Sequence, residues 1–389
     1  MSRLLCCALL CLPAVATAET ATGPAIDPLP RQGTDFSLLR EPALEVVEDL
    51  PPVSLLVPLH GDEPGLEENL RSFALQDYPG CQLVLGVARA DDRALAIAQC
   101  VAASLPDRCI EIDVGEVASA RNPKLANVLS MMRLVRHKVL ILADSDTRVD
   151  PAYVRSVTAP LHQRGVGAVT CLFAGDPDAS FSAKLGAMFI NEQFIPSVLV
   201  NELFGPPRHC LGPTNAVRSA VLSAIGGFEA LAAHLADDFM LGHNVAARGL
   251  RVVISRYVVR TIVTDPTLVA LWNHELRWHR TIRGVRPAGY AGMFLTYPVP
   301  LALLALLLAP RPKRVAILVA AIVVRIALQR ISGRVFGVAT APAWLVLPRD
   351  LFGIAVWACG LTGKAVRWRG AQLEIEEGDV LAERRHSGG

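Results

Sequence analysis

The sequence lacks the cysteine spacings and the excess of one charge that define several common classes of protein. Its nine cysteines are scattered and none forms a C-x-x-C pair, so neither a zinc site nor a disulfide framework is predicted. Their odd number is typical of a reducing compartment. The 38 Lys and Arg residues nearly balance the 36 Asp and Glu residues, so the composition indicates no nucleic-acid partner.

Charged residues are scarce, and the chain is apolar instead. Only 19% of the 389 residues are charged, whereas 52% are hydrophobic, and the mean hydropathy is +0.38. This is too apolar for an ordinary soluble protein, and the excess falls in three zones. The first, 4–18, follows Arg3 and ends in Ala-Thr-Ala, which resembles a signal peptide. An uncleaved anchor or a misassigned start would also account for it.

The other apolar zones, 288–331 and 340–365, predict two to four membrane helices. Arg325 and the pair Arg349-Asp350 are costly inside lipid, so we expect them at the membrane interface or inside the helix bundle. The chain therefore divides into an apolar anchor or signal-like segment (1–20), a linker (21–50), a central domain (51–286), membrane helices (287–366) and a basic and acidic C-terminal tail (367–389).

The central domain alternates apolar runs with amphipathic stretches. The apolar runs predict buried strands, and the stretches between them have helical periodicity. Strands that alternate with helices predict a largely parallel, doubly wound α/β sheet. The predicted strands are 53–59, 82–88, 109–114 and 138–143, and the predicted helices are 63–76, 93–105 and 123–135, with a further helical run at 226–236.

The glycine-rich nucleotide motifs are missing. No G-x-G-x-x-G follows the first strand and no G-x-x-x-x-G-K-[ST] occurs, which argues against a dinucleotide-binding enzyme and a P-loop kinase or ATPase. Nucleotide binding through acidic residues and a metal ion remains. Asp91-Asp92 and Asp144-Ser145-Asp146 follow the second and fourth strands, where functional sites of α/β proteins lie. The second motif could hold Mg²⁺ or Mn²⁺ against a diphosphate, or form a simple turn or helix cap.

Four short motifs, taken together, resemble a known family. They are "ARADDRA" (88–94), "ADSD" (143–146), "LADDFML" (235–241) and "HELRW" (274–278). In this order, and followed by membrane helices, they resemble processive-type glycosyltransferases of the GT-A (Rossmann-like) fold, and more narrowly the ceramide glucosyltransferase family. Within that family the chain is most similar to the bacterial hopanoid-biosynthesis glycosyltransferases that act on bacteriohopanetetrol. Two positions depart from the pattern, Val57 and His274, where the family often has lysine and Gln or Arg.

The resemblance implies a donor site and a metal site. It places the UDP-sugar contacts at Asp91, Asp92, Lys124, Asn127, Asp144 and Asp237, and the metal ligands at Asp144 and Asp146. Asp91 and Asp92 would contact the uracil or the ribose. Lys124 and Asn127 open a helix whose positive N-terminal end suits an anion. The structural alternatives are an acidic turn for the first pair and a solvated helical turn for the second.

The resemblance also implies catalytic residues. Inversion at a sugar carbon requires a base that takes the proton of the attacking hydroxyl. That base would be Asp238, and the carboxylate of Asp237 beside it would raise its pKa. Asp265-Pro266 predicts the start of the next helix, as N-cap and first residue. On that helix Arg277 would steady the departing diphosphate, and Trp278 would close the acceptor site.

The sequence therefore predicts a membrane enzyme that transfers a sugar from a UDP-sugar to a lipid hydroxyl. The resemblance favours N-acetylglucosamine and bacteriohopanetetrol, with glucose and ceramide as the alternative. The expected partners are the donor, the lipid acceptor (hopanoid or ceramide) and the bilayer. The supply of UDP-sugars indicates a catalytic domain on the cytoplasmic face of a bacterial inner membrane. A polysaccharide synthase or an inactive membrane scaffold of a glycan-synthesis complex stays open.

Overall fold

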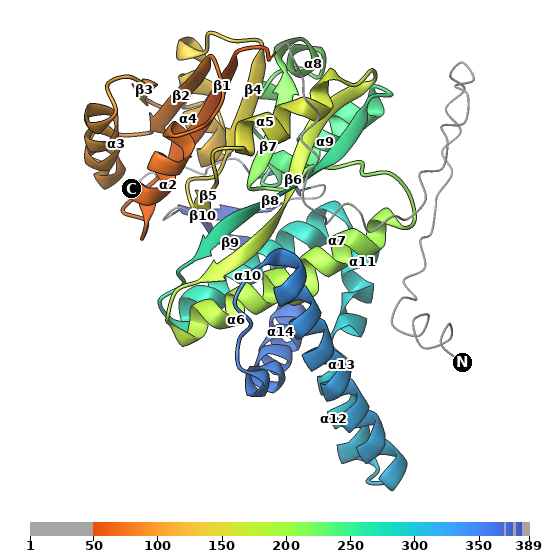
Figure 1. Cartoon of the computed structure of the whole chain (residues 1–389). Helices are drawn as coiled ribbons and strands as arrows, with labels where there is room; N and C mark the ends of the chain where they lie inside the picture. The colour runs from red at the N-terminus through yellow and green to blue at the C-terminus, as the bar shows by residue number, and fades with distance from the viewer. Residues whose placement is uncertain (1–49, 369–370, 376–378, 383–389) are drawn as a thin grey trace, which may run out of the picture.

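The computed structural model describes residues 50–368, 371–375 and 379–382. The predicted segment 1–20 and nearly all of the linker 21–50 lie outside these residues. A mixed α/β domain lies over a group of C-terminal helices, and the long strands β6 and β8 reach from one part to the other (Figure 1). The α/β domain therefore sits directly against the helices that carry the apolar zones.

The domain is built on one eight-stranded sheet with the order β3-β2-β1-β4-β7-β6-β8-β5. Its strands are β1 (Val53–Leu59), β2 (Cys81–Val87), β3 (Cys109–Val114), β4 (Val139–Ala143), β5 (Thr147–Arg148), β6 (Val166–Pro177), β7 (Thr214–Arg218) and β8 (Arg251–Val263). The four strands predicted from apolar runs are therefore all present.

The prediction of a largely parallel sheet is right: β1 to β4, β6 and β8 run in one direction, whereas β7 and β5 run in the opposite direction. Leu55 pairs in parallel register with Leu83 and Ile141. β7 then runs antiparallel to β4, with Ala216 opposite Ile141, and β6 runs antiparallel to β7. Apolar periodicity indicates that a segment forms a strand but not in which direction it runs, so the reversed direction of β7 and β5 was not visible in the sequence.

The two faces of β1 explain how helices cover the sheet. Successive side chains of a strand point to opposite faces. Leu55 and Val57 belong to an apolar cluster that includes Phe73 of α2 (Leu66–Ala74). Leu56 belongs to a second cluster with Val128 of α4 (Pro123–Met131). β1 is therefore buried on both faces and needs an unbroken apolar sequence.

The sheet curls so that its far edge returns to the end of β4. Only three residues separate β5 from the end of β4, yet β5 pairs with β8 at the opposite end of the strand order, with Thr147 opposite Thr261. The chain crosses from one side of the curl to the other at Asp144-Ser145-Asp146. This short motif therefore lies where both halves of the sheet meet.

The remaining helices of the domain connect the strands. They are α3 (Arg93–Ser104), α5 (Tyr153–Thr158), α6 (Phe181–Phe189), the π-helix η4 (Ile190–Phe194), α7 (Ile195–Glu202), α8 (Ser219–Ala224), α9 (Asp237–Ala247) and α10 (Leu268–Val285). Four short 3₁₀ segments, η2 (Met132–Leu134), η3 (Ala159–His162), η5 (Glu229–Leu231) and η6 (Met293–Thr296), complete this part, and η7 (Ala343–Leu345) precedes the last helix.

Two helix predictions are wrong. The run 226–236 forms turns around the short η5, because Gly226 and Gly227 have positive φ angles that interrupt a helix. α10 begins at Leu268 rather than at Pro266, with Thr267 as the N-cap residue. Asp265 instead lies 3.2 Å from Nδ1 of His274, further along the same helix. The Asp265 carboxylate therefore contacts His274 instead of capping the helix.

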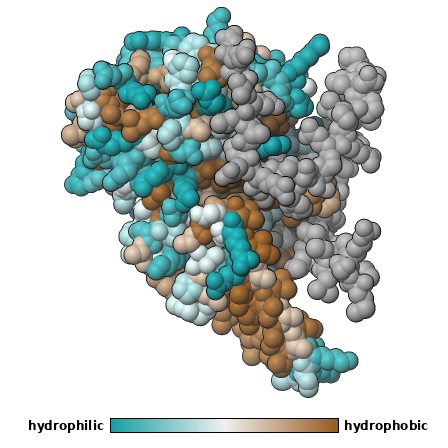
Figure 2. Space-filling view, in the orientation of Figure 1, coloured by the Kyte–Doolittle hydropathy of each residue, from teal (hydrophilic) through white to brown (hydrophobic). Residues whose placement is uncertain are grey.

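The C-terminal helices carry the membrane-spanning candidates. In the described part of the chain, two helical stretches are long and apolar enough to cross a membrane: Pro312–Phe336 (α13), and Ala343–Gly360, which joins η7 to α14 (Val346–Gly360). A third candidate combines α11 (Pro287–Gly292) and η6 with α12 (Pro298–Leu308), bent by 66°. Apolar side chains cover the outer surface of this protruding part (Figure 2). The protein is therefore a membrane protein by composition and architecture.

Arg325, Arg349 and Asp350 are buried and paired inside the helix bundle, as expected. Arg325 donates to both oxygens of Asp350 at 3.1 Å and lies 3.3 Å from Glu192 of η4. Arg349 makes a two-pronged ion pair with Glu275 of α10. Charges inside a membrane region are tolerated when they face the bundle interior and pair with one another. These pairs join α13 and α14 to the α/β domain.

The predicted tail 367–389 contains ordered structure in its described residues. β9 (Ala365–Trp368) and β10 (Ala371–Glu374) form an antiparallel hairpin. Leu373, Ile375 and Leu381 pack against Leu235, just before α9. The chain therefore returns from the last apolar helix to the α/β domain.

Candidate active site

The acidic turn between β4 and β5 is fixed by its neighbours. The Asp144 N–H donates to the Pro213 carbonyl at 3.1 Å, and the Ile262 N–H donates to the Asp146 carbonyl at 2.8 Å. Between them, Asn69 of α2 donates to the Ser145 carbonyl at 3.0 Å. A helix, a loop and a strand thus fix the backbone of the turn that carries the two carboxylates.

Lys124 joins this turn to the third acidic motif. Asn122 caps α4, because its side chain accepts from the Lys124 N–H at 2.9 Å, and Pro123 takes the first helical position. This places Lys124 in the first turn, where its Nζ lies 2.8 Å from Asp144 Oδ1 and 3.3 Å from Asp237 Oδ2. Burial alone would lower the pKa of Lys124, but the two carboxylates raise it, so the lysine stays charged.

Asp238 and Asp144 face each other across a glycine. A Cβ atom at Gly212 would lie 3.7 Å from the Oδ2 atom of each. The backbone of the loop before β7 therefore approaches both carboxylates, and a larger side chain at 212 would enter the space beside them. Burial raises the pKa of Asp238 to about 7, and the Asp237 carboxylate contributes in the same direction. Such a pKa suits a general base that works near neutral pH.

The two residues of the first acidic motif, Asp91 and Asp92, have different environments. The exposed Asp91 pairs with Arg89 at 2.7 Å. Asp92 caps α3 by accepting from the Ala94 N–H, and it also accepts from the Gly61 N–H at 2.8 Å. Asp92 thus ties the end of β1 to the end of β2, where a donor base would approach. The roles of both in donor binding remain predictions.

Asn127 lies at the same edge but is fully buried. Its Nδ2 donates to the Gly86 carbonyl at 2.9 Å and to the Leu59 carbonyl at 3.4 Å, which are the ends of β2 and β1. The Asn127 side chain therefore bridges the ends of β1 and β2. Its predicted position near the nucleotide is compatible with this place, and its contact to a ligand remains a prediction.

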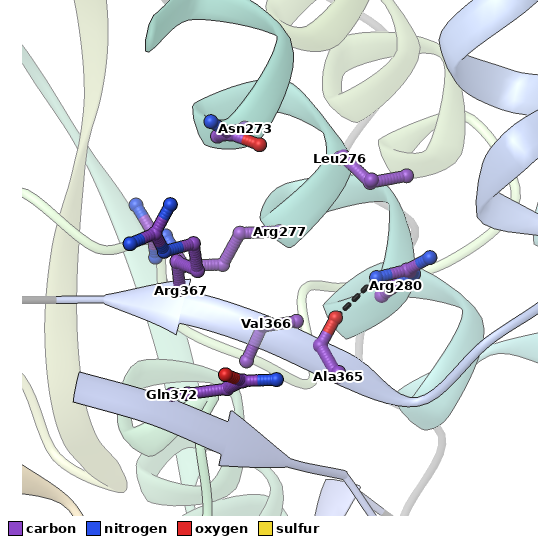
Figure 3. Close-up of a pocket in the computed structure, with 8 residues that line it drawn as sticks. All are labelled: Asn273, Leu276, Arg277, Arg280, Ala365, Val366, Arg367 and Gln372. Carbon is purple, nitrogen blue, oxygen red and sulfur yellow. Dashed lines mark hydrogen bonds between the residues drawn. The ribbon is translucent and has the colours of Figure 1, made fainter.

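Arg277 and Trp278 lie on α10 and point in different directions. Trp278 packs edge-on against Phe173 of β6 and near Phe189 and Phe194. The Arg277 guanidinium lies 5.5 Å from the ring centre of Trp368 in the C-terminal hairpin. It lines a cavity of about 220 Å³ between α10 and β9, in which Arg367 lies beside it (Figure 3). The tryptophan is thus part of the packing under β6, and the arginine faces the hairpin.

The residues of the acidic turn fit a divalent cation. In the parts of the chain that the structure describes, no cluster of three or more His, Cys, Asp or Glu side chains forms a complete metal cage. One or two carboxylates together with phosphate oxygens and water are typical ligands of Mg²⁺. Burial raises the pKa of Asp146 well above its usual range, and the carboxylates of Asp144 and Glu63 add to this. A bound cation would relieve that repulsion.

Two features of the site had little or no signal in the sequence. The place of Gly212 between two carboxylates depends on the curl of the sheet and not on a local pattern. Asp379 lies 0% exposed in the C-terminal segment, and its carboxylate accepts from the Ala236 N–H next to Asp237. No local pattern connects residues 143 positions apart.

The fold belongs to the GT-A class of glycosyltransferases. The structure aligns with the mannosyltransferase PcManGT from Pyrobaculum calidifontis, solved in complex with GDP-Man and Mn²⁺, with a TM-score of 0.50 and 17% sequence identity. The alignment covers 83% of this chain and 91% of that one. At this identity the likeness concerns the fold alone.

The family is shown by the sequence itself. Residues 32–381 match the model of glycosyl transferase family 21, and the chain belongs to this family. Ceramide glucosyltransferase 1 of Caenorhabditis elegans is 22% identical over 231 residues, which are 59% of this chain and 49% of that protein. Ceramide glucosyltransferase 3 of the same organism is 22% identical over 244 residues, 60% and 51% of the two chains. The chain spans about half the length of the curated relatives that it matches.

Proposed function

We propose that this protein is an inverting, metal-dependent membrane glycosyltransferase that transfers a sugar from a UDP-sugar to a hydroxyl group of a membrane lipid. The observation that supports this most strongly is the grouping of Asp144, Asp237 and Asp238 around Lys124 at the end of the sheet. Ligands of open α/β sheets bind at this end.

Each residue of the group has a task in the proposed reaction. Asp238 takes the proton of the lipid hydroxyl, and the resulting oxygen attacks the anomeric carbon as the bond to the UDP oxygen breaks. One in-line displacement inverts the anomeric centre and gives a β-glycoside. Asp144 and Asp146 would hold Mg²⁺ or Mn²⁺, which would neutralise charge on the diphosphate. Lys124 adds a fixed positive charge, and Arg277 is proposed to steady the leaving group.

The acceptor is proposed to enter from the membrane helices. α10 lies between the sheet and α14, because Trp278 packs on Phe173 of β6 while Glu275 pairs with Arg349 of α14. A helix in this place contacts both the catalytic domain and the lipid-facing part. This arrangement suits an acceptor whose apolar body stays in the bilayer while its hydroxyl reaches the site.

The finer specificity rests on resemblance. We favour N-acetylglucosamine as the sugar and bacteriohopanetetrol as the lipid, in hopanoid biosynthesis. The second candidate is glucose transfer to ceramide, which the names of the curated relatives favour. A supply of UDP-sugars favours a catalytic domain on the cytoplasmic side of a bacterial inner membrane.

A product assay with two donors and two acceptors tests this proposal. Membranes that contain the protein are incubated with Mn²⁺ or Mg²⁺ and labelled UDP-N-acetylglucosamine or UDP-glucose, with bacteriohopanetetrol and ceramide offered separately. Label on the hopanoid from the first donor supports the favoured specificity. Label on ceramide from UDP-glucose supports the same mechanism with the alternative substrates. No label on either lipid, with EDTA making no difference, favours the inactive scaffold.

A further inference from the structure

The start of α9 has no cap of its own. The N-cap position is Ala236, whose side chain offers no acceptor, although this position favours Ser, Thr, Asp or Asn. The next two residues are Asp237 and Asp238, so the geometry of this turn sets where the proposed base lies. An N-terminal helical turn without a cap leaves backbone N–H groups unsatisfied and frays more easily.

A residue far along the chain instead binds the N–H of the N-cap residue itself. The Asp379 carboxylate accepts from the Ala236 N–H, and the Asp379 carbonyl accepts from the Leu235 N–H at 3.1 Å. In a local capping box an acidic side chain within the helix reaches back to the N-cap N–H. Here a residue from the segment after the last apolar helix takes the same position.

Asp379 adopts a conformation that is unusual for its residue type. Its φ angle is +66°, and among the non-glycine residues that the structure describes it alone has a positive φ. It is also fully buried. A buried residue in the left-handed region is held there by its surroundings, and such positions concentrate at functional sites. The hydrogen bonds to Leu235 and Ala236 are the contacts that hold it.

The same segment also touches the helices that carry Lys124 and Arg277. The Leu381 carbonyl accepts from Arg121 at 3.0 Å, next to the N-cap residue of α4. The Leu381 N–H donates to the Ala233 carbonyl at 2.7 Å. In the hairpin, Ala365 accepts from Arg280 of α10, as Figure 3 shows. Contacts from one segment therefore reach α10 and the residues that lead into α4 and α9.

We propose that the described C-terminal segment, 365–368, 371–375 and 379–382, is a structural part of the active site, and that Asp379 is a positioning residue that fixes the first turn of α9 and thereby Asp238. This inference rests on the proposed function for the role of Asp238. It assigns to Asp379 no contact with the substrate. The segment acts by holding the proposed base in place.

The positive φ angle supplies the variants that test this role. Asp379→Gly removes the carboxylate and suits a positive φ. Asp379→Asn keeps an oxygen acceptor, and asparagine also tolerates this conformation. The exposed Asp107→Asn, which lies outside this segment, is the control. The full-length protein is purified, and three quantities are measured: kcat and donor KM for transfer, the Kd of UDP, and amide hydrogen exchange of residues 233–241.

A displaced base should lower the rate of transfer without weakening the binding of the donor. We expect Asp379→Gly to reduce kcat at least about tenfold, because small displacements of reacting groups cost this much or more. The donor KM and the Kd of UDP stay within about twofold, since no ground-state contact is lost. Amide exchange at 233–241 becomes faster. Asp379→Asn keeps most of the activity, and Asp107→Asn is unchanged.

Two results would overturn the inference if the wild type transfers sugar. One is an Asp379→Gly protein with the kcat and the exchange rate of the wild type. Another is a loss of UDP binding together with kcat, which would make Asp379 a residue of general folding. If the wild type transfers no sugar, the proposed function fails separately. Hydrogen exchange then still decides, because unchanged exchange at 233–241 in Asp379→Gly would show that Asp379 does not fix α9.

Discussion

The electrostatics of the site depend on one buried lysine among several carboxylates. Lys124 is 5% exposed and is shared by Asp144 and Asp237. A buried charge is costly unless it is paired, so this lysine makes the close approach of the acidic motifs possible. Lys124 lowers the pKa of Asp238, but burial and, after it, the neighbouring Asp237 carboxylate outweigh this effect and raise that pKa to about 7.

The raised pKa of Asp238 predicts an acid limb in the pH profile. The base is active only when deprotonated, so kcat/KM should be constant above its pKa and should fall about tenfold for each pH unit below about 7. Steady-state rates between pH 5 and pH 9 at saturating Mn²⁺ measure this. A profile that stays flat down to pH 5 would contradict a base with a raised pKa.

The carboxylates of the acidic turn predict that sugar transfer requires a metal ion. UDP binding tests this independently of the rate. Asp144→Asn and Asp146→Asn should each lower kcat/KM by about a hundredfold or more, because the metal supplies several kcal/mol of charge stabilisation. UDP should also bind the wild type more weakly in EDTA than in Mn²⁺, and the variants should lose this difference. The exposed Asp107→Asn is the control. UDP affinity that is equal in EDTA and Mn²⁺ would contradict the metal site.

At the scale of elements, α9 is held by close packing as well as by its cap. A Cβ atom at Gly242 of α9 would lie 2.3 Å from the Cys210 nitrogen and 2.4 Å from the His209 carbonyl carbon. Both contacts are backbone atoms of the segment that leads to Gly212. The distance between Asp238 and Gly212 therefore depends on a residue without a side chain one turn further along the helix.

Gly242→Ala should accordingly push α9 away from this segment. Overpacking of a tight interior typically costs about 1–3 kcal/mol, so we expect a lower thermal midpoint together with a lower kcat. The matched control is Gly289→Ala in α11, where the nearest atom to an added Cβ is 3.8 Å away. Differential scanning fluorimetry and the transfer assay measure both effects. A wild-type midpoint for Gly242→Ala would contradict this close packing.

The ion pair between α10 and α14 connects the α/β domain to the apolar helices. Arg349 and Glu275 are 0% and 3% exposed. Removal of one partner from a buried pair typically costs about 3–5 kcal/mol, whereas replacement of both by apolar groups costs much less. Arg349→Met should therefore lower the thermal midpoint in detergent more than the double variant Arg349→Met/Glu275→Leu does. Equal losses in the two variants would contradict a coupled pair.

The sequence predicted those elements whose signals are local. The four apolar strands, the acidic residues after two of them and the paired charges in the apolar helices all follow from short stretches. The direction of β7, the pairing of β5 with β8 and the contact of Asp379 with Ala236 depend on residues far apart in the chain. The two residues of the first acidic motif also look alike in sequence, and only the fold separates the exposed Asp91 from the cap Asp92.

At the scale of the whole molecule, the chain is arranged in layers. The sheet with its acidic turn lies furthest from the apolar helices, α10 lies between, and α12 and α13 protrude with apolar surfaces (Figures 1 and 2). α13 has 25 residues and is therefore about 37 Å long, enough to cross the roughly 30 Å of bilayer hydrocarbon. In the proposed function, this order brings the soluble donor and the membrane lipid to opposite sides of one site.

The account depends on Asp238 acting as the base at the meeting point of these layers. The most direct measurement compares sugar transfer to lipid by the wild type, Asp238→Asn and the exposed control Asp107→Asn, with UDP binding measured on each. We predict that Asp238→Asn loses about a hundredfold or more of kcat, as removal of a general base does, while UDP binding stays near that of the wild type. Full turnover by Asp238→Asn would contradict the account.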